Sequence, residues 1–294
     1  MTTKKETTLL DSSLNTVPFS SKHTLNSYKK YSIKILDCKE YKQLYIFEKS
    51  KFYKYKDLED NLHLLDYDKK LILNDNNYSS SLNTDNEVLF KNVIRSKIKL
   101  QRLAKSNCDS WKTFITLTFN ENITDLSIAY KKFRNFTRSI SRIKKDFKWL
   151  CVPEFQKSGR VHYHLVTNID LEDQNIIFKQ EFEGNIYFHT KQWQKNGFDC
   201  IESVKDKDGN DTKKICGYIS KYMSKSYIED CFFNRNRYYC SQNLNRPREI
   251  LIDLDNEEDL NNYLKLINTC DAIYSNNYKD NFDNLITFIE LREK

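Results

Sequence analysis

Apolar and polar residues follow their clearest pattern in the middle of the chain. Four segments rich in β-branched and aromatic residues predict strands: residues 112–119, 148–156, 160–168 and 198–204. Apolar residues at helical spacing predict one helix over residues 122–147 and another over residues 213–226. The second helix has a single apolar stripe, formed by Ile215, Tyr218, Ile219, Tyr222 and Met223.

The order of these segments predicts a fold class. Lys157, Ser158 and Gly159 form a hairpin signal between the second and third strands, and a loop with a short helix around Trp193 precedes the fourth strand. A strand, helix, strand, strand, strand and helix in this order are what a split βαβ, ferredoxin-like sheet requires. We therefore expect an α+β fold with an antiparallel sheet and additions at both chain ends.

The flanking regions differ from this block in composition. Residues 1–30 are rich in Ser, Thr, Asn and Lys and predict a disordered tail. Residues 31–85 contain two strand-like runs and predict a small N-terminal module that ends in a polar linker. Residues 86–250 form the predicted central domain, which begins with a helix over residues 87–106. Residues 251–294 form an acidic C-terminal segment.

Composition excludes several classes of protein. The five glycines lie too far apart to form a dinucleotide-binding G-x-G-x-x-G or an ATPase P-loop. None of the eight cysteines forms a C-x-x-C pair, so a zinc ribbon is not expected and the thiols are predicted to be reduced. No apolar run approaches the length of a membrane span, and the polar N-terminus does not resemble a signal peptide. We expect a soluble intracellular protein without membrane contact.

Positive charge is concentrated in one part of the chain. The whole chain has 48 Lys and Arg against 41 Asp and Glu, whereas residues 91–150 hold 15 of the basic and only four of the acidic residues. A cluster of cations favours a polyanionic partner such as nucleic acid, although any single one could belong to a solvated face. The candidate DNA-binding residues on this basic helix are Lys131, Lys132, Arg134, Arg138, Arg142, Lys144 and Lys145.

A histidine pair in the third strand is a candidate metal site. His162 and His164 are two residues apart, so both side chains leave the same face of a strand. A three-residue loop at residues 157–159 places Glu154 opposite His162 on that face, whereas a two-residue turn points it away. Gly159 suits the left-handed third position of the longer loop. Two nitrogen ligands and one oxygen ligand suit Mg²⁺ or Mn²⁺ when phosphate oxygens fill the remaining coordination positions. The alternative is an ordinary surface strand that carries two histidines.

Two tyrosines in the last predicted helix are candidate nucleophiles. Tyr218 and Tyr222 are four residues apart and share a helix face, and Lys221 and Lys225 each follow a tyrosine by three residues. Tyrosine is common in this chain, so the pair could simply pack beside Ile219 in the apolar stripe. The pattern favours catalysis only in combination with the histidine pair.

Three motifs together resemble a known family. FITLTF at residues 114–119, the His-Tyr-His run after Glu154, and YISKYMSK at residues 218–225 are similar to motifs one, two and three of the HUH endonucleases that initiate rolling-circle replication. The likeness is strongest to the two-tyrosine initiators of small single-stranded DNA phages and related plasmids. WQKNG at residues 193–197 and the tyrosines that follow Arg237 also resemble landmarks of these proteins. The resemblance covers about residues 110–250.

The resemblance implies a fold of the HUH endonuclease type and a reaction. In this family a metal polarises a phosphate of single-stranded origin DNA, and a tyrosine attacks it to give a 5′-phosphotyrosine and a free 3′-OH primer. His162, His164 and Glu154 would bind Mg²⁺ or Mn²⁺, and Tyr218 and Tyr222 would be the nucleophiles. Lys221 and Lys225 would position phosphate or metal. A host helicase and polymerase would be the protein partners, in the cytoplasm of a bacterial host of the phage or plasmid.

Other interpretations stay open. A transposase or relaxase would use the same chemistry without starting DNA synthesis, and a DNA-binding plasmid maintenance protein would need no chemistry. The chain departs from initiators that carry their own helicase, because it has no P-loop. If neither tyrosine of the pair is the nucleophile, Tyr227 is the next candidate.

Overall fold

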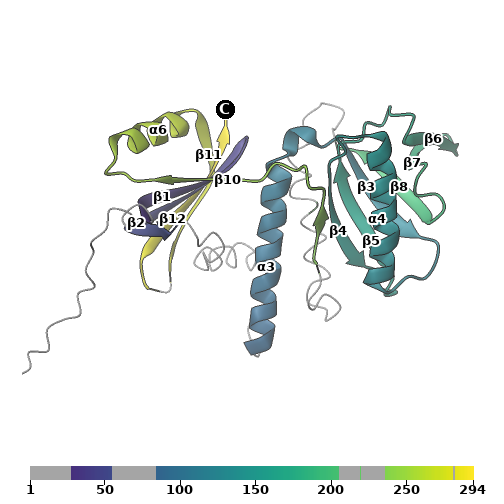
Figure 1. Cartoon of the computed structure of the whole chain (residues 1–294), viewed down its shortest axis with the longest axis horizontal. Helices are drawn as coiled ribbons and strands as arrows, with labels where there is room; N and C mark the ends of the chain where they lie inside the picture. Colours follow the sequence, from purple (N-terminus) through teal and green to yellow (C-terminus); the bar gives the residue numbers. More distant parts are fainter. Residues whose placement is uncertain (1–27, 55–83, 205–218, 220–235, 281) are drawn as a thin grey trace, which may run out of the picture.

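The computed structural model contains two antiparallel five-stranded sheets joined by a long helix (Figure 1). It describes residues 28–54, 84–204, 219, 236–280 and 282–294. The α+β class predicted from the sequence is confirmed. Most of the predicted disordered tail, the polar linker before residue 84 and nearly all of the predicted helix over residues 213–226 lie outside the described residues. No helix in the described ranges is long and apolar enough to cross a membrane.

The first sheet, called the histidine sheet below, is built from the central block of the sequence. Its strand order is β8-β3-β5-β4-β9. The strands are β3 (Thr113–Phe119), β4 (Trp149–Phe155), β5 (Val161–Thr167), β8 (Gly197–Ser203) and the short β9 (Tyr239–Cys240). The first four match the predicted strands closely. Because β5 is inserted between β3 and β4, the unit that links those two strands is a split βαβ unit.

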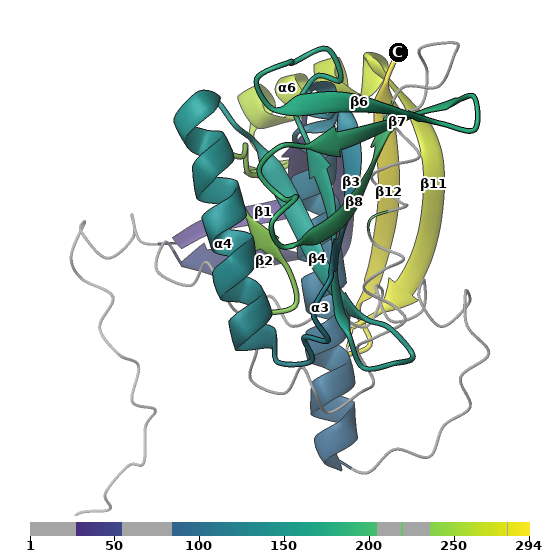
Figure 2. The ribbon, with the colours of Figure 1, turned by 90° about the vertical axis from the view of Figure 1, so that its right-hand side faces the viewer.

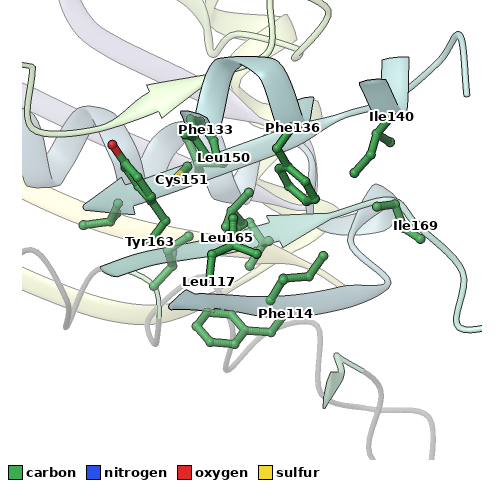
Figure 3. Packing of buried hydrophobic residues seen from close by; sticks show 14 of the residues in the cluster. Phe114, Leu117, Phe133, Phe136, Ile140, Leu150, Cys151, Tyr163, Leu165 and Ile169 are labelled. Atoms are coloured by element: carbon green, nitrogen blue, oxygen red, sulfur yellow. The ribbon is translucent and has the colours of Figure 1, made fainter. Parts of the chain in front are cut away.

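Helix α4 (Leu126–Ile143) makes that link and covers one face of the histidine sheet (Figure 1). It begins later than predicted because Asp125 caps it, accepting hydrogen bonds from the backbone nitrogens of Ser127 (2.5 Å) and Ile128 (3.2 Å). Its buried stripe includes Phe133 and Phe136. Phe133 stacks on Tyr163 of β5 with ring centroids 4.6 Å apart, and both belong to the core shown in Figure 3.

Between β5 and β8 the structure differs from the sequence prediction. β6 (Ile177–Phe182) and β7 (Asn185–Thr190) form a separate hairpin, where the sequence predicts a loop. Its faces carry mostly exposed residues, so the chain lacks the clear alternation of a half-buried strand. The short helix predicted around Trp193 is a series of turns at residues 191–196. Trp193 is fully buried there and donates its Nε1 hydrogen to the Thr118 carbonyl oxygen at 3.1 Å.

The second sheet, called the terminal sheet below, combines the two ends of the described chain. Its order is β10-β1-β2-β12-β11. The elements are β1 (Tyr28–Cys38), β2 (Tyr41–Lys54), β10 (Arg248–Ile252), α6 (Glu257–Asn268), β11 (Cys270–Lys279) and β12 (Leu285–Glu293). Residues 31–85 and 251–294 look independent in the sequence, but the structure pairs β1 with β10 and β2 with β12. Alternation predicts a strand without naming its partner, so this pairing could not be predicted.

Helix α3 (Thr84–Lys105) and the short 3₁₀ helix η1 (Cys108–Ser110) lie between the two sheets (Figures 1 and 2). Leu100 and Leu103 of α3 are buried in the core cluster of the histidine sheet. On another side of the same helix, Arg102 donates hydrogen bonds to the Gln43 side chain and to the Tyr45 hydroxyl, each at 2.8 Å. Helix α3 therefore contacts both sheets.

The close approach at Gly197 predicts a stability effect. A Cβ added to Gly197 would lie 2.1 Å from the Thr118 carbonyl oxygen, a backbone atom that cannot move aside alone. We expect Gly197→Ala to lower the free energy of unfolding in urea by about 3 kcal/mol, the upper range for overpacking. Gly184→Ala is the control: its Cβ meets nothing within 4 Å, and only its left-handed backbone opposes the change, at about 1 kcal/mol. An equal or smaller loss for Gly197→Ala would contradict this packing.

Candidate functional site

The two histidines of β5 share a face of the histidine sheet, as the sequence predicts. Tyr163 lies between them in the strand and points into the core beneath α4 (Figure 3). Because side chains alternate along a strand, His162 and His164 leave the opposite face, away from α4. Both are nearly buried, with exposed fractions of 8% and 6%. Burial also raises the pKa of Tyr163 far above its usual range, so this phenol stays neutral and is not a candidate nucleophile.

The hairpin between β4 and β5 has the three-residue loop that the sequence predicts. The Gln156 nitrogen donates a hydrogen bond to the Arg160 carbonyl oxygen at 2.8 Å, which closes the loop at residues 157–159. Gly159 has a φ of +80°, the left-handed conformation expected at the third position. Glu154 and His162 are therefore direct cross-strand partners. The predicted position of Glu154 on the histidine face is confirmed.

His164 and Glu154 contact each other in the structure. The Nε2 atom of His164 lies 2.6 Å from Oε2 of Glu154. Its other ring nitrogen, Nδ1, lies 3.2 Å from the Thr116 hydroxyl on β3. Carboxylate and hydroxyl thus hold the imidazole from two sides, and the ring orientation is well defined. The role of Thr116 was not predicted, although the alternation in FITLTF would place Thr116 and Thr118 on one face.

His162 has one ring nitrogen without a partner. Its Nε2 atom is buried and has no hydrogen-bond partner among the described residues. Its Nδ1 atom lies 3.3 Å from the Gln156 side-chain nitrogen. Burial lowers the pKa of His162, and the nearby His164 adds to this effect while Glu154 opposes it. The imidazole is therefore held neutral, in the form that binds metals.

These side chains fit a divalent metal in their chemistry but do not converge on one point. Two imidazoles and one carboxylate are suitable donors, and the buried Nε2 of His162, which has no hydrogen-bond partner among the described residues, fits a metal ion as its partner. Within the described part of the chain, however, no three His, Cys, Asp or Glu side chains form a ready metal-binding group. Glu154 is bonded to His164 instead. Metal binding would have to exchange this contact for bonds to the ion.

Two rows of side chains cross the histidine face. The β-sheet register aligns Glu154, His162, Thr118 and Phe198 in one row, and Val152, His164, Thr116 and Cys200 in the next. Phe198 is 60% exposed, and Cys200 is exposed as well. Neither residue was singled out in the sequence, because their nearness to the histidines depends on the pairing of β8 with β3.

The predicted DNA-binding cations lie on the other side of the sheet. Lys131, Lys132, Arg134, Arg138 and Arg142 are on α4, and Lys144 and Lys145 follow its last turn. Lys132 forms an ion pair with Glu121 at 2.7 Å, and Lys144 pairs with Asp146 at 3.1 Å. Because α4 covers the face opposite the histidines, the structure does not bring these cations to the histidine pair. At the end of the sheet that carries the row of His162, Lys157 and Arg160 lie between β4 and β5, and exposed Lys195 lies two residues before β8.

The predicted nucleophiles cannot be placed. Tyr218, Lys221, Tyr222 and Lys225 lie outside the described residues, as does the alternative Tyr227. Ile219 alone of this segment is described. It is helical, fully buried and part of the core cluster of the histidine sheet. The residue that follows Tyr218 in the sequence therefore belongs to the domain that carries the histidines.

Comparison with known proteins relates the central part of the chain to DNA replication. Residues 112–227 match the family model of the replication-associated protein ORF2. A curated relative, the phasyl DNA replicon protein arp of Escherichia coli, is 27% identical over 124 residues, which cover 38% of this chain and 42% of that protein. No solved structure matches the chain. Both similarities support a replication-associated family for the segment that runs from β3 through the tyrosines.

Proposed function

We propose that this protein initiates replication by nicking single-stranded origin DNA through a tyrosine nucleophile. The observation that carries the proposal is the shared face of Glu154, His162 and His164, on which the buried His162 Nε2 has no partner among the described residues. The strand order β8-β3-β5-β4 supports a ferredoxin-like sheet of the HUH type, because β5 splits the β3–α4–β4 unit. Neither comparison favours a transposase, a relaxase or a non-catalytic maintenance protein.

In this proposal His162, His164 and Glu154 hold Mg²⁺ or Mn²⁺, which would withdraw electron density from the scissile phosphate. Thr116 orients His164 through its hydroxyl, and Gln156 orients His162, as outer partners of metal ligands do. In the flipped orientation of the Gln156 amide, its oxygen would accept a hydrogen bond from Nδ1 of His162. The Nε2 atom of His162 would then carry no proton, and its lone pair could bind the ion.

The proposed nucleophile is the phenol of Tyr218 or Tyr222. Its oxygen loses a proton and bonds to phosphorus as the bond to the 3′ oxygen breaks. The leaving 3′ oxygen takes up a proton, so the products are a 5′-phosphotyrosine and a 3′-OH that can prime synthesis. Lys221 and Lys225 would stabilise the negative charge that develops on the phosphoryl oxygens and the phenolate. A host helicase would then unwind the duplex, and a host polymerase would extend the primer.

The metal assignment predicts the effects of three substitutions. We expect nicking of an origin oligonucleotide to require Mg²⁺ or Mn²⁺ and to fall to background in His162→Ala or His164→Ala. Glu154→Gln keeps the side-chain size but loses the charge, so more metal should be needed for half-maximal nicking. His23→Ala, outside the segment of similarity, serves as the control. Undiminished nicking in EDTA, or by the double histidine variant, would rule out the assignment.

The tyrosine assignment predicts a separation of binding from chemistry. Phe keeps the ring and loses only the hydroxyl, so the double variant Tyr218→Phe/Tyr222→Phe should bind origin DNA normally and form no covalent adduct on a denaturing gel. Tyr218→Phe alone should lose most initial cleavage, and Tyr222→Phe should mainly impair strand transfer. An adduct that persists in the double variant would show that the nucleophile lies elsewhere, with Tyr227 as the next residue to test.

The position of the basic helix predicts two kinds of DNA contact. We expect changing Lys131, Arg134, Arg138 and Arg142 to Gln to weaken binding of a long single strand and to reduce its salt dependence, by about 0.7 in the slope of log K against log salt per lost phosphate contact. Cleavage of an oligonucleotide just long enough for the histidine face should not change, because α4 lies on the opposite face. Changing Lys157, Arg160 and Lys195 to Gln should weaken both. Equal effects of the two sets of substitutions on cleavage of the short oligonucleotide would contradict this separation of the two DNA contacts.

A further inference from the structure

Phe198 is a large aromatic side chain left exposed beside the candidate metal site. It is 60% exposed, whereas the two histidines on the same face are nearly buried. Phe198 is the cross-strand partner of Thr118, which is in turn the partner of His162. All three side chains therefore leave the same face of the histidine sheet. Two strand spacings separate Phe198 from His162, which is about 10 Å and comparable to the size of a nucleotide.

The ring of Phe198 is supported from the protein side. It lies edge-on against the buried His189 ring of β7, with centroids 5.2 Å apart. His189 is itself held by Asp199, through contacts of its Nδ1 atom with the carbonyl oxygen (2.8 Å) and with Oδ1 (3.1 Å). Asp199 also accepts hydrogen bonds from the nitrogen (2.8 Å) and the hydroxyl (2.5 Å) of Thr190. A buried polar network thus positions an exposed ring on a rigid strand.

Charge along β8 indicates where a nucleic-acid strand can run. Side chains alternate, so Phe198, Cys200 and Glu202 all lie on the histidine face. Glu202 is exposed and would repel a phosphate at its end of the strand. At the other end, exposed Lys195 precedes Phe198, and the loop with Lys157 and Arg160 lies beyond the row that contains His162. The favourable path therefore crosses the sheet along the row that contains Phe198.

We propose that Phe198 is a stacking platform for one base of the single-stranded DNA, the base of a nucleotide next to the phosphate that lies at the histidines. The proposal rests on the proposed function for its substrate. An aromatic face accepts any base, so this contact supplies affinity and register without reading a particular sequence. The supported ring loses little freedom on binding, which favours a stacking role over a merely exposed side chain.

The test is a binding measurement that needs no chemistry. The full chain is titrated in EDTA with fluorescent single strands that carry an abasic residue at each position in turn. We expect one position near the cleavage point at which the abasic residue weakens binding to the wild type about 10-fold, the size of one base–aromatic stack. Phe198→Ala should weaken binding of the intact strand by a similar factor and lose its sensitivity at that position. Phe198→Trp should restore both.

A matched control separates stacking from general exposure. Phe182, on the β6–β7 hairpin, is 58% exposed and lies outside the row, so Phe182→Ala should leave binding unchanged. Cys200 lies in the row next to that of Phe198 and gives a second readout, because DNA bound along the row of Phe198 should slow its alkylation, followed at that residue by mass spectrometry. Binding within twofold of wild type for Phe198→Ala, or an equal loss for Phe182→Ala, would overturn the platform even if the protein nicks DNA. Absence of nicking with the abasic pattern intact would overturn the proposed function instead.

Discussion

The burial of Tyr163 is the constraint on which the candidate site depends. Its ring stacks on Phe133 of α4 within the core cluster, and every residue of β5 is buried. With this residue anchored on the α4 side, the two-residue repeat of the strand places His162 and His164 together on the other side. A shift of β5 by one residue would exchange the core tyrosine with a histidine and destroy both the core and the site. Packing therefore enforces the histidine arrangement.

Neighbouring strands complete the site from this central strand. β4 contributes Glu154 through a loop that Gly159 makes possible, and β3 contributes Thr116 to the ring of His164. β8 adds Phe198 at the end of the row that contains Glu154 and His162. Each contribution comes from a backbone pairing rather than from a flexible loop, so the site is held by the same hydrogen bonds that hold the sheet. The basic surface of α4, by contrast, is separated from the histidines by the thickness of the sheet.

The terminal sheet joins the segments that precede and follow this domain in the chain. It needs strands from both ends of the described chain, and α3 joins it to the core of the histidine sheet. An ion pair joins β1 to β10 in the terminal sheet: the buried ammonium of Lys34 lies 2.5 Å from the partly exposed carboxylate of Glu249. Burial lowers the pKa of Lys34, which Glu249 opposes, so removing Glu249 would leave a costly buried charge. The segment similar to replication-associated proteins thus lies between two halves of a second unit, which the family model does not cover.

The sequence by itself determined what local chemistry can encode. The two-residue repeat predicted β3, β4, β5 and β8, and Gly159 selected the loop that sets Glu154 against His162. Such features depend on neighbouring residues and on allowed backbone angles. Only the tertiary structure decided which distant strands pair, which face α4 covers and how Glu154 contacts His164. It paired strands from the two ends of the described chain in one sheet and placed Phe198 in the row that contains His162. These outcomes depend on how whole surfaces fit together, and no short stretch of sequence contains that information.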